Sequence, residues 1–485
     1  MHRTVPEWLP LALVCAAALW LRCVGLQHRP MHADEANQAV KAGQLLESGR
    51  YRFDPADHHG PTLYYAVLPV AWARGQRTLA SLDETTLRLV PAVAGTLAVL
   101  FVGLLARPLG RWLAAAAAGF MALDPAALYY SRYFIQETLL VSFTLGTLLC
   151  ARRWASSGRL TWAVAAGAGA GLMQATKASA PLFLAAALLA WLLCRAERGF
   201  PLLRRCAAHA LAAAGAAAVV LVLFYTSFGS NPAGAADSLS TYGHVAARLQ
   251  SGDTGHEKPW TYFLGLLTWQ RRGGLLFEQA GLTALALLGC AGAVARAGRL
   301  LRWAALYGAV LLVVLSATPY KTPWHVVHLV PATAILAAGS LAWMGSSRRG
   351  AWAGVLVAAA VAGSLGFQAH RVVAVYAADP RNPYAYVHSS PDVLKFRPLA
   401  DEALKRDPSG VIRVVSEEYW PLPWYFRGLD GVGYWSQPPD NCDGALVVAS
   451  AGLAESVSLR LHGPYRKSYL GLRPGFVCVV FTPEK

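Results

Sequence analysis

The chain has 485 residues, of which 55% are hydrophobic and only 14% are charged. This composition and a mean hydropathy of +0.37 exclude an ordinary water-soluble globular protein, and they predict a polytopic α-helical membrane protein. The net charge of +16 comes from basic residues spread over many short connections. It therefore does not indicate a nucleic-acid-binding surface.

Apolar runs long enough to cross about 30 Å of hydrocarbon occur throughout the first 370 residues. The shorter run 61–72 is predicted to be a half-inserted or interfacial segment. No small-residue cleavage site follows the first span, so we expect it to remain as an anchor. We predict about eleven transmembrane helices, at 7–26, 87–106, 111–130, 134–151, 160–175, 179–195, 205–228, 274–295, 300–317, 324–345 and 350–370.

Every second connection between these spans is rich in arginine. The basic connections are 107–111, 152–159, 195–205, 296–302 and 348–349. Cytoplasmic loops retain positive charge, so this alternation predicts an orientation in the cell membrane. The connections expected on the extracytoplasmic side are 27–86, 122–133, 229–273, 318–323 and the tail after 370.

The chain is predicted to consist of two domains. Residues 1–370 form a transmembrane domain with a large first outer loop at 27–86, and residues 371–485 form a small extracytoplasmic α/β domain. In the second domain, Cys442 and Cys478 could form a disulfide or remain free thiols. Its expected elements are helices at 391–405 and 453–461 and strands at 411–416, 445–449 and 475–481.

An adjacent acid pair, Asp34 and Glu35, follows the first predicted span. Asp34 is expected to N-cap an amphipathic interfacial helix over residues 35–47, because a side-chain oxygen can bind the free N–H groups there. A carboxylate fixed beside the membrane could also accept a proton from an acceptor hydroxyl or ligate a divalent cation.

A second polar group in the same outer loop contains His58 and His59. Two histidines with an acid nearby could ligate a metal. Side chains that are adjacent on an extended chain point in opposite directions, so we expect one histidine to line a pocket. Gly60 and Pro61 then form a turn into an aromatic segment that includes Tyr64.

The third polar group lies in the short connection 122–133 and the helix that follows it. Asp124 before Pro125 is a favourable N-cap pair. Tyr130 and its neighbouring tyrosines either form an aromatic belt at the membrane interface or line a pocket. Glu137 lies in an otherwise apolar helix, where an ionisable group is usually functional or paired, and Arg132 is its expected partner.

Two lysines occupy other predicted outer turns. Lys177 is expected either to extend to the interface or to bind an anion. Lys321 lies between two prolines and beside Tyr320 and Trp324, which stiffen a turn that presents one cation at the membrane surface. Phosphate is a natural counter-ion for such a site.

These motifs together resemble the GT-C glycosyltransferases, the superfamily that includes protein O-mannosyltransferases and aminoarabinose transferases. The similarity is greatest to a prokaryotic branch labelled flippase-activity-associated, and it covers most of the chain. The motifs are His32-Ala33-Asp34-Glu35, His59-Gly60-Pro61, Tyr130-Ser131-Arg132, Ala175-Thr176-Lys177, Tyr320-Lys321-Thr322-Pro323-Trp324 and Trp420-Pro421-Leu422-Pro423-Trp424-Tyr425.

The resemblance implies an inverting transferase that moves a sugar from a polyprenyl-phosphate donor to a lipid, glycan or protein acceptor. An acid of the first outer loop would be the general base, which by position is Asp34, with Glu35 orienting it or contacting a metal. Lys321 would hold the donor phosphate. The second outer turn departs from the pattern of the branch, so either Gln136 or Glu137 occupies the place of its acid.

The remaining assignments complete this hypothesis. Lys177 and Arg132 are further candidates for the donor phosphate, while Glu35 and His59 are candidate ligands for a divalent metal. The pocket is expected to include His58, His59, Tyr64, Tyr130, Tyr320 and Trp324. Two alternative functions remain, namely a lipid-linked sugar translocator and a non-catalytic assembly subunit of a glycan pathway.

Overall fold

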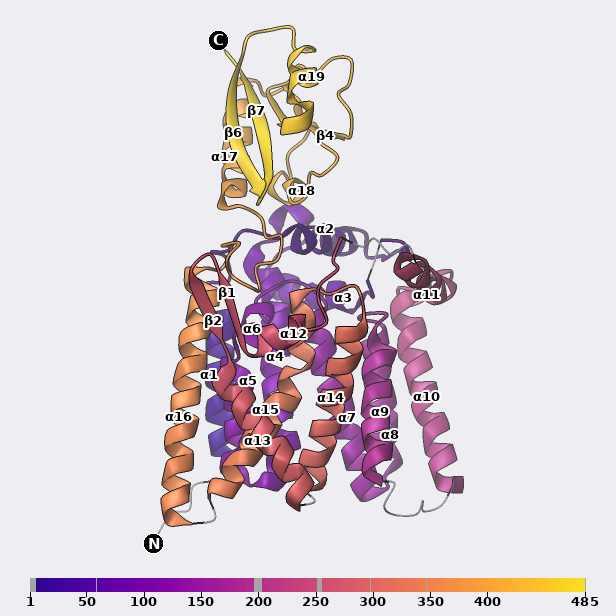
Figure 1. Cartoon of the computed structure of the whole chain (residues 1–485). Helices are drawn as coiled ribbons and strands as arrows, with labels where there is room; N and C mark the ends of the chain where they lie inside the picture. Colours follow the sequence, from indigo (N-terminus) through magenta and orange to yellow (C-terminus); the bar gives the residue numbers. More distant parts are fainter. Residues whose placement is uncertain are drawn as a thin grey trace.

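The computed structural model describes residues 6–57, 59–195, 203–250, 255–296, 298–345 and 347–484. A bundle of long helices carries a small sheet domain at one end, which we call the loop end (Figure 1). The bundle contains α1 (Leu9–Cys23), α4 (Glu84–Ala106), α5 (Arg111–Leu123), α7 (Glu137–Ser157), α8 (Leu160–Gln174), α9 (Ala180–Arg195), α10 (Leu203–Tyr225), α13 (Ala280–Arg296), α14 (Arg299–Ala317), α15 (Val330–Met344) and α16 (Arg348–His370).

Each of the eleven predicted spans overlaps one of these helices, but three of the spans also include residues that form a different element. The predicted span 111–130 breaks at Asp124, which accepts a hydrogen bond from Ala127 N at 2.8 Å and starts the short helix α6 (Pro125–Tyr130). The first part of 324–345 is the 3₁₀ helix η3 (Pro323–His328). Residues 275–278 form a strand instead of the start of a helix.

That strand, β2 (Leu275–Glu278), pairs with β1 (Trp269–Arg272) in an antiparallel hairpin. Gly273 and Gly274 connect the strands, and both have positive φ angles, 51° and 79°. A glycine pair suits a two-residue hairpin because residues in its turn adopt left-handed conformations at little steric cost. The Gly-Gly pair is therefore the feature of the sequence that indicates a hairpin here instead of the start of a helix.

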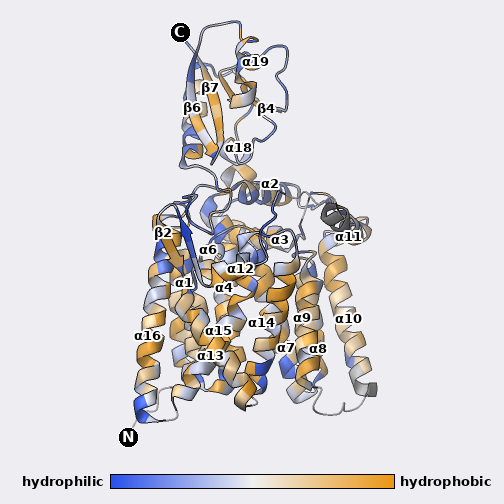
Figure 2. Ribbon diagram, in the orientation of Figure 1, coloured by the Kyte–Doolittle hydropathy of each residue, from blue (hydrophilic) through white to orange (hydrophobic). Residues whose placement is uncertain are grey.

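The surface of the bundle is strongly apolar (Figure 2). Leu211 on α10 and Val294 on α13 are 75% and 82% exposed. A continuous apolar exterior is costly in water but suits a bilayer. Four stretches of the described residues are long and apolar enough to cross a membrane, Glu84–Leu109, Ala207–Tyr225, Arg299–Ala317 and Arg348–Val375, and the total of eleven spans stays a prediction.

The loop end gathers the long connections between helices (Figure 1). The arginine-bearing links α4–α5 and α7–α8 lie at the opposite end, as the alternation of the helices requires. The two ends of the bundle therefore differ as predicted for these connections, and the side of the membrane that each end faces stays a prediction. Short elements at the loop end include α2 (Ala33–Ser48), α3 (Thr62–Ala73), η1 (Leu79–Ser81), α11 (Gly234–Gln250), α12 (Tyr262–Leu267) and the hairpin β1–β2.

Helix α2 lies across the loop end and corresponds to the predicted amphipathic helix. Its buried face includes Ala36, Ala39, Ala42 and Leu45 at helical spacing. It ends at Gly49, whose left-handed conformation lets its N–H bond Leu45 O. The predicted N-cap was wrong by two residues, because the side chain of His32 caps the helix instead of Asp34.

The C-terminal domain follows α16 and one π-helical turn, η4 (Arg371–Val375). Its five strands lie in the order β4-β3-β5-β7-β6, with β3 parallel to both neighbours and β7 antiparallel to both of its own. The elements are η5 (Pro391–Lys395), α17 (Phe396–Arg406), β3 (Ile412–Val415), α18 (Leu422–Tyr425), β4 (Val432–Trp435), β5 (Leu446–Ser450), η6 (Ala451–Leu453), α19 (Ala454–Ser458), β6 (Tyr465–Arg473) and β7 (Phe476–Pro483).

Two strands of this domain, β4 and β6, were missing from our prediction. Both lie at edges of the sheet, where one side of the strand has no partner strand. Strand β6 has the sequence YRKSYLGLR and is exposed over much of its length. Edge strands commonly carry charged residues, so β6 lacks the apolar run that marks a buried strand.

The disulfide alternative for Cys442 and Cys478 is wrong in this structure, where both residues are free thiols. The sheet separates them. Cys478 packs on the face of β7 that also carries Val480, whereas Cys442 packs with Val447 and Val479 on the other face. Successive side chains of a strand alternate between faces, so these two thiols cannot meet without moving the sheet.

The C-terminal domain is firmly attached to the loop end. One apolar cluster includes residues of α2 and α3 together with residues of β3 and β5. Three polar contacts reinforce it: Met31 N donates to Tyr425 Oη at 2.9 Å, Trp424 Nε1 donates to Glu84 Oε1 at 2.7 Å, and Arg427 donates to Leu82 O. The two domains therefore share a core at their junction.

The first outer loop is joined to the turn between α8 and α9. Gly60 N donates to Thr176 O at 3.1 Å, and Thr62 N donates to Ala175 O at 3.2 Å. A Cβ atom added to Gly60 would lie 2.1 Å from Ala175 O. Glycine is therefore required here by close approach of the two backbones.

We predict that Gly60→Ala lowers the free energy of unfolding by about 1–3 kcal/mol, because the added methyl group would force the two segments apart. Thermal unfolding of the purified protein in detergent measures the effect. The matched control is Gly119→Ala in α5, where an added Cβ meets open space. Equal unfolding temperatures for the two variants would contradict the prediction.

Candidate functional site

Glu35 is fully buried and forms the centre of an ion-pair network at the loop end. Arg88 contacts both of its oxygens, with Nε to Oε1 and Nη2 to Oε2 each at 2.9 Å, and Arg29 Nη2 lies 3.1 Å from Oε1. The backbone N–H groups of Phe134 and His32 also donate to the carboxylate. Burial alone would raise the pKa of Glu35, but the two guanidinium groups hold it well below its usual range.

Arg88 also organises the connection between α1 and α2. Its Nη1 donates to Leu26 O at 2.7 Å and to Arg29 O at 2.8 Å, and its Nη2 donates to Pro30 O at 3.1 Å. Our sequence analysis missed Arg88, although it lies in an apolar span, where a charged residue usually has a partner. Glu35 is thus a buried structural residue, and its contacts support neither the predicted catalytic role nor the predicted metal ligation.

Asp34, the neighbour of Glu35, is exposed. Its side chain is 51% accessible and lies in the first turn of α2. Its backbone N–H donates to His32 Nδ1 at 3.0 Å, while its own Oδ2 lies 3.8 Å from the same nitrogen. At 3.8 Å this is not a hydrogen bond, so the exposed carboxylate of Asp34 can meet a ligand from outside.

Lys321 is 3% exposed and lies in the turn between α14 and η3. Its ammonium group donates to Thr318 O at 2.6 Å, and it forms no ion pair with an acid among the described residues. Burial lowers the pKa of Lys321 below its ordinary value. A buried cation without an anionic partner is unfavourable unless a ligand supplies the negative charge.

A segment that precedes the C-terminal domain links these two residues, and we call residues 382–388 the strap. His32 Nε2 lies 3.1 Å from Tyr386 O, and Tyr386 Oη lies 2.8 Å from His256 Nδ1. The carbonyl of His256 accepts a hydrogen bond from Lys321 N at 3.1 Å. One chain of contacts thus runs from the start of α2 to the buried lysine.

The other predicted charged residues have structural partners. Glu137 and Lys177 form an ion pair with each other, with side chains 3% and 14% exposed, so the predicted Glu137–Arg132 pair is wrong. Arg132 instead donates to the carbonyls of Leu21 and Gly25 at the end of α1. Because these groups already have partners, the geometry does not favour their predicted catalytic and phosphate-binding roles.

The aromatic candidates divide into two groups. Tyr64 is buried and donates to Gln38 Oε1, and Tyr130 is buried and donates to Tyr384 O at 2.8 Å, so both pack the interior. Tyr130 thereby contacts the strap, and Tyr320 and Trp324 lie near the strap and its partner His256. The ring of Tyr320 is 4.7 Å from that of His256, and the ring of Trp324 is 6.0 Å from that of Tyr386.

The structure describes one of the two predicted pocket histidines. His58 lies outside the described residues. His59 is exposed and interacts electrostatically with His325 of η3, so the first outer loop lies near the turn that carries Lys321. Within the described ranges, no group of three or more His, Cys, Asp or Glu side chains could hold a metal ion. Ligation of a metal ion by Glu35 and His59 alone stays a prediction.

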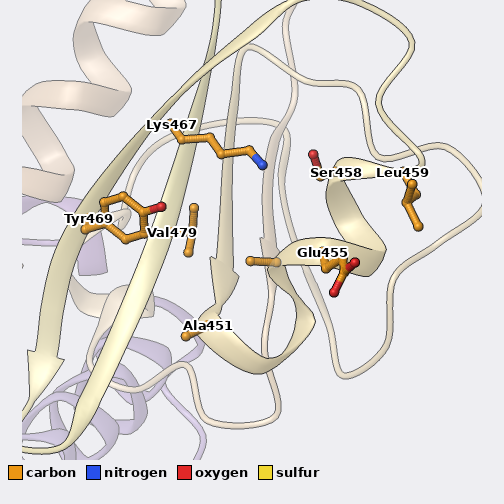
Figure 3. A pocket seen from close by; sticks show the side chains of 8 residues that line it. Ala451, Glu455, Ser458, Leu459, Lys467, Tyr469 and Val479 are labelled. Carbon is orange, nitrogen blue, oxygen red and sulfur yellow. The ribbon is translucent and has the colours of Figure 1, made fainter.

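Two cavities lie elsewhere, in the C-terminal domain. One of about 370 Å³ lies between α19 and the strands β6 and β7, where Lys467 and Tyr469 face Glu455 and Ser458 (Figure 3). The other, of about 520 Å³, is lined in part by Arg406, Asp443 and Tyr465. Neither is lined by Asp34, Lys321 or the strap, so the polar contacts at the loop end define the candidate site.

Comparison with known proteins gives the fold its context. Residues 69–228 match the family model of the dolichyl-phosphate-mannose-protein mannosyltransferases, and no curated protein matches the sequence. Among solved structures, ArnT from Cupriavidus metallidurans bound to undecaprenyl phosphate superposes with a TM-score of 0.67 over 97% of each chain, at 17% identity. The chain has the GT-C fold.

The resemblance to the GT-C glycosyltransferases is therefore confirmed at the level of the fold. A second GT-C structure is the oligosaccharyltransferase AglB from Archaeoglobus fulgidus, in complex with an inhibitory peptide and a dolichol-phosphate. It matches with a TM-score of 0.57 and 14% identity, over 96% of this chain and 72% of AglB. The GT-C fold is a membrane-spanning helical fold, which agrees with the apolar surface of the bundle.

We predict that Glu35→Gln lowers the free energy of unfolding by about 3–5 kcal/mol, because it leaves two buried guanidinium groups without their counter-charge. Unfolding in detergent across a pH series measures this. The folded-state pKa of Glu35 is depressed, so its stabilisation is present above its ordinary value of 4.5 and declines as the pH falls further.

The glutamine variant should lack that part of the acid dependence. Asp34→Asn is the control, since this neighbouring side chain is exposed and contributes little to stability. The prediction fails if Glu35→Gln is as stable as Asp34→Asn at neutral pH.

Proposed function

We propose that this GT-C chain is a glycosyltransferase that takes a sugar from a polyprenyl-phosphate donor and transfers it to a hydroxyl group of a lipid, glycan or protein acceptor. One observation carries the proposal. An exposed acid and a buried lysine at the loop end are connected by a single chain of polar contacts, which runs through the strap. Asp34 is open to a ligand, and Lys321 has no acidic partner among the described residues.

The donor phosphate would bind at Lys321. A phosphate oxygen could replace water at the ammonium group and supply the charge that the surrounding protein does not. The lysine is held by contacts with the backbone, because Lys321 N donates to His256 O and Lys321 Nζ donates to Thr318 O. Two neighbours in the comparison, ArnT and AglB, are described with a polyprenyl phosphate bound. Their lipids suggest the same class of donor for this chain.

The proposed reaction is a single displacement. The acceptor oxygen attacks the anomeric carbon, the bond from that carbon to the phosphate oxygen breaks, and the configuration inverts. Asp34 takes the proton of the acceptor hydroxyl, and the lipid leaves as a phosphate monoester whose charge Lys321 stabilises. The rigid framework supplies orientation, which is the larger part of what such a reaction requires.

We further propose that the loop end faces the extracytoplasmic side of the cell membrane. The arginine-bearing links lie at the opposite end of the bundle, where the positive-inside rule predicts cytoplasm. This places the C-terminal domain outside the cell membrane with the proposed active site. Lipid-linked donors carry their sugar at the membrane surface, so a site at this depth can reach it.

We predict that Asp34→Asn lowers the rate of sugar transfer by about 10²–10⁴-fold, because the amide cannot accept the proton. The assay follows the transfer of radiolabelled sugar from undecaprenyl-phosphate hexoses to extracted cell-envelope acceptors. Asp440→Asn, at an exposed position in the C-terminal domain, is the control. An Asp34→Asn variant that turns over at the wild-type rate would exclude Asp34 as the base.

We predict that Lys321→Gln weakens the binding of undecaprenyl phosphate by about 10- to 100-fold, because the phosphate loses a charge-assisted hydrogen bond. Equilibrium binding in detergent at fixed ionic strength measures the change. Lys467→Gln removes an exposed lysine of β6 and is the matched control. Unchanged binding by Lys321→Gln would move the donor phosphate to another part of the chain.

A further inference from the structure

His388 is a buried residue at the end of the strap, and the proposed reaction does not use it. Its side chain is 1% exposed, and its Nδ1 lies 3.1 Å from Ser389 O. A carbonyl oxygen only accepts hydrogen bonds, so Nδ1 must carry the hydrogen. The other nitrogen, Nε2, is then a lone-pair acceptor, and it has no hydrogen-bond partner in the part of the chain that the structure describes.

The imidazole of His388 is neutral. Burial lowers the pKa of His388 well below its ordinary range, and the nearby charge of Arg29 lowers it further. The neighbouring His32 cannot satisfy Nε2 of His388. Its own Nδ1 accepts from Asp34 N, and its Nε2 contacts Tyr386 O. A buried acceptor without a donor is rare in proteins and calls for an explanation.

The backbone beside His388 is also unusual. Val387 has a φ angle of +47°, a left-handed conformation that β-branched residues rarely adopt. Hydrogen bonds before and after Val387 in the chain hold it in this conformation. Asn382 Nδ2 donates to Val372 O at 3.0 Å, and Ser390 N donates to Leu472 O at 2.9 Å. Strain that the surroundings maintain in this way is concentrated at functional sites.

The groups around His388 belong to the candidate site. Its ring lies 5.6 Å from the ring of His32, the residue that caps α2 and holds Asp34. It also lies 6.1 Å from the ring of Tyr133, which packs against the guanidinium group of Arg29 at 4.4 Å. Only the side chain of His32 therefore separates the ring of His388 from the proposed base, Asp34.

We propose that Nε2 of His388 accepts a hydrogen bond from a sugar hydroxyl in the bound complex, either of the donor sugar or of the acceptor. The inference rests on the proposed function. A neutral lone pair repels phosphate oxygens, which Lys321 would bind, and it attracts a hydroxyl hydrogen. His388 would thereby help to recognise the sugar while Lys321 recognises the lipid phosphate.

Two substitutions separate the two nitrogens of the ring. His388→Asn keeps an amide N–H near the place of Nδ1, for Ser389 O, but has no atom at the place of Nε2. His388→Gln reaches that place with an amide oxygen that can accept. His462→Asn is the matched control, because His462 is 72% exposed in the C-terminal domain and pairs with Asp443.

The first measurement is equilibrium binding without acceptor, using undecaprenyl phosphate and its mannose, glucose and galactose derivatives. If the hydroxyl belongs to the donor, His388→Asn binds the bare lipid like the wild type and binds the preferred hexose lipid about tenfold more weakly. His388→Gln recovers part of that loss. If the hydroxyl belongs to the acceptor, both lipids bind normally, and the KM for acceptor rises about tenfold in the transfer assay.

Three results would overturn the inference. In the first, His388→Asn matches the wild type in both measurements. In the second, it weakens the binding of both lipids equally and also lowers the unfolding temperature. In the third, a cryo-EM map of the wild-type complex shows only water at Nε2. That map also decides the case in which His388→Asn does not fold. Failure of the wild type to transfer sugar would instead refute the proposed function, while the lipid comparison still tests the donor contact.

Discussion

The buried carboxylate of Glu35 is the constraint on which the loop end depends. An ionised group in the protein interior is several kcal/mol unfavourable unless partners surround it, at roughly the magnitude of a whole domain's stability. Here the partners come from the α1–α2 connection, from α4 and from the segment before α7. Satisfying one charge therefore fixes three parts of the chain relative to one another, and the start of α2 with them.

The loop end separates charged groups that stabilise from charged groups that can act. Glu35 lies between two arginines, and Glu137 pairs with Lys177, so the charge of each of these buried carboxylates is compensated within the protein. Asp34 is exposed, and the charge of Lys321 is not matched by an acid in the described part of the chain. The buried ion pairs make the loop end rigid. This rigidity positions Asp34 and Lys321, although neither forms an ion pair with an oppositely charged Asp, Glu, Lys or Arg in the described part of the chain.

Much of the fold could be predicted from the sequence, because apolar runs of membrane-spanning length depend on local composition. Errors arose where tertiary contacts decide the outcome. Residues 34 and 35 are adjacent on a helix, and the contacts of Glu35 with Arg88 and Arg29 show which one faces the interior. Likewise, Glu137 has a cation nearby in sequence but pairs with Lys177, 40 positions away. The strap carries no periodic signal, so His388 could not be found in advance.

Because of the strap, the candidate site extends beyond the end of the helical bundle in the sequence. By fold, the bundle ends with α16 at His370, but Tyr386 and His388 belong to the candidate site and come later in the chain. A chimera joined immediately after α16 would exchange part of the site along with the sheet domain. A crossover between Ser390 and Pro391 would instead leave the strap with its own bundle.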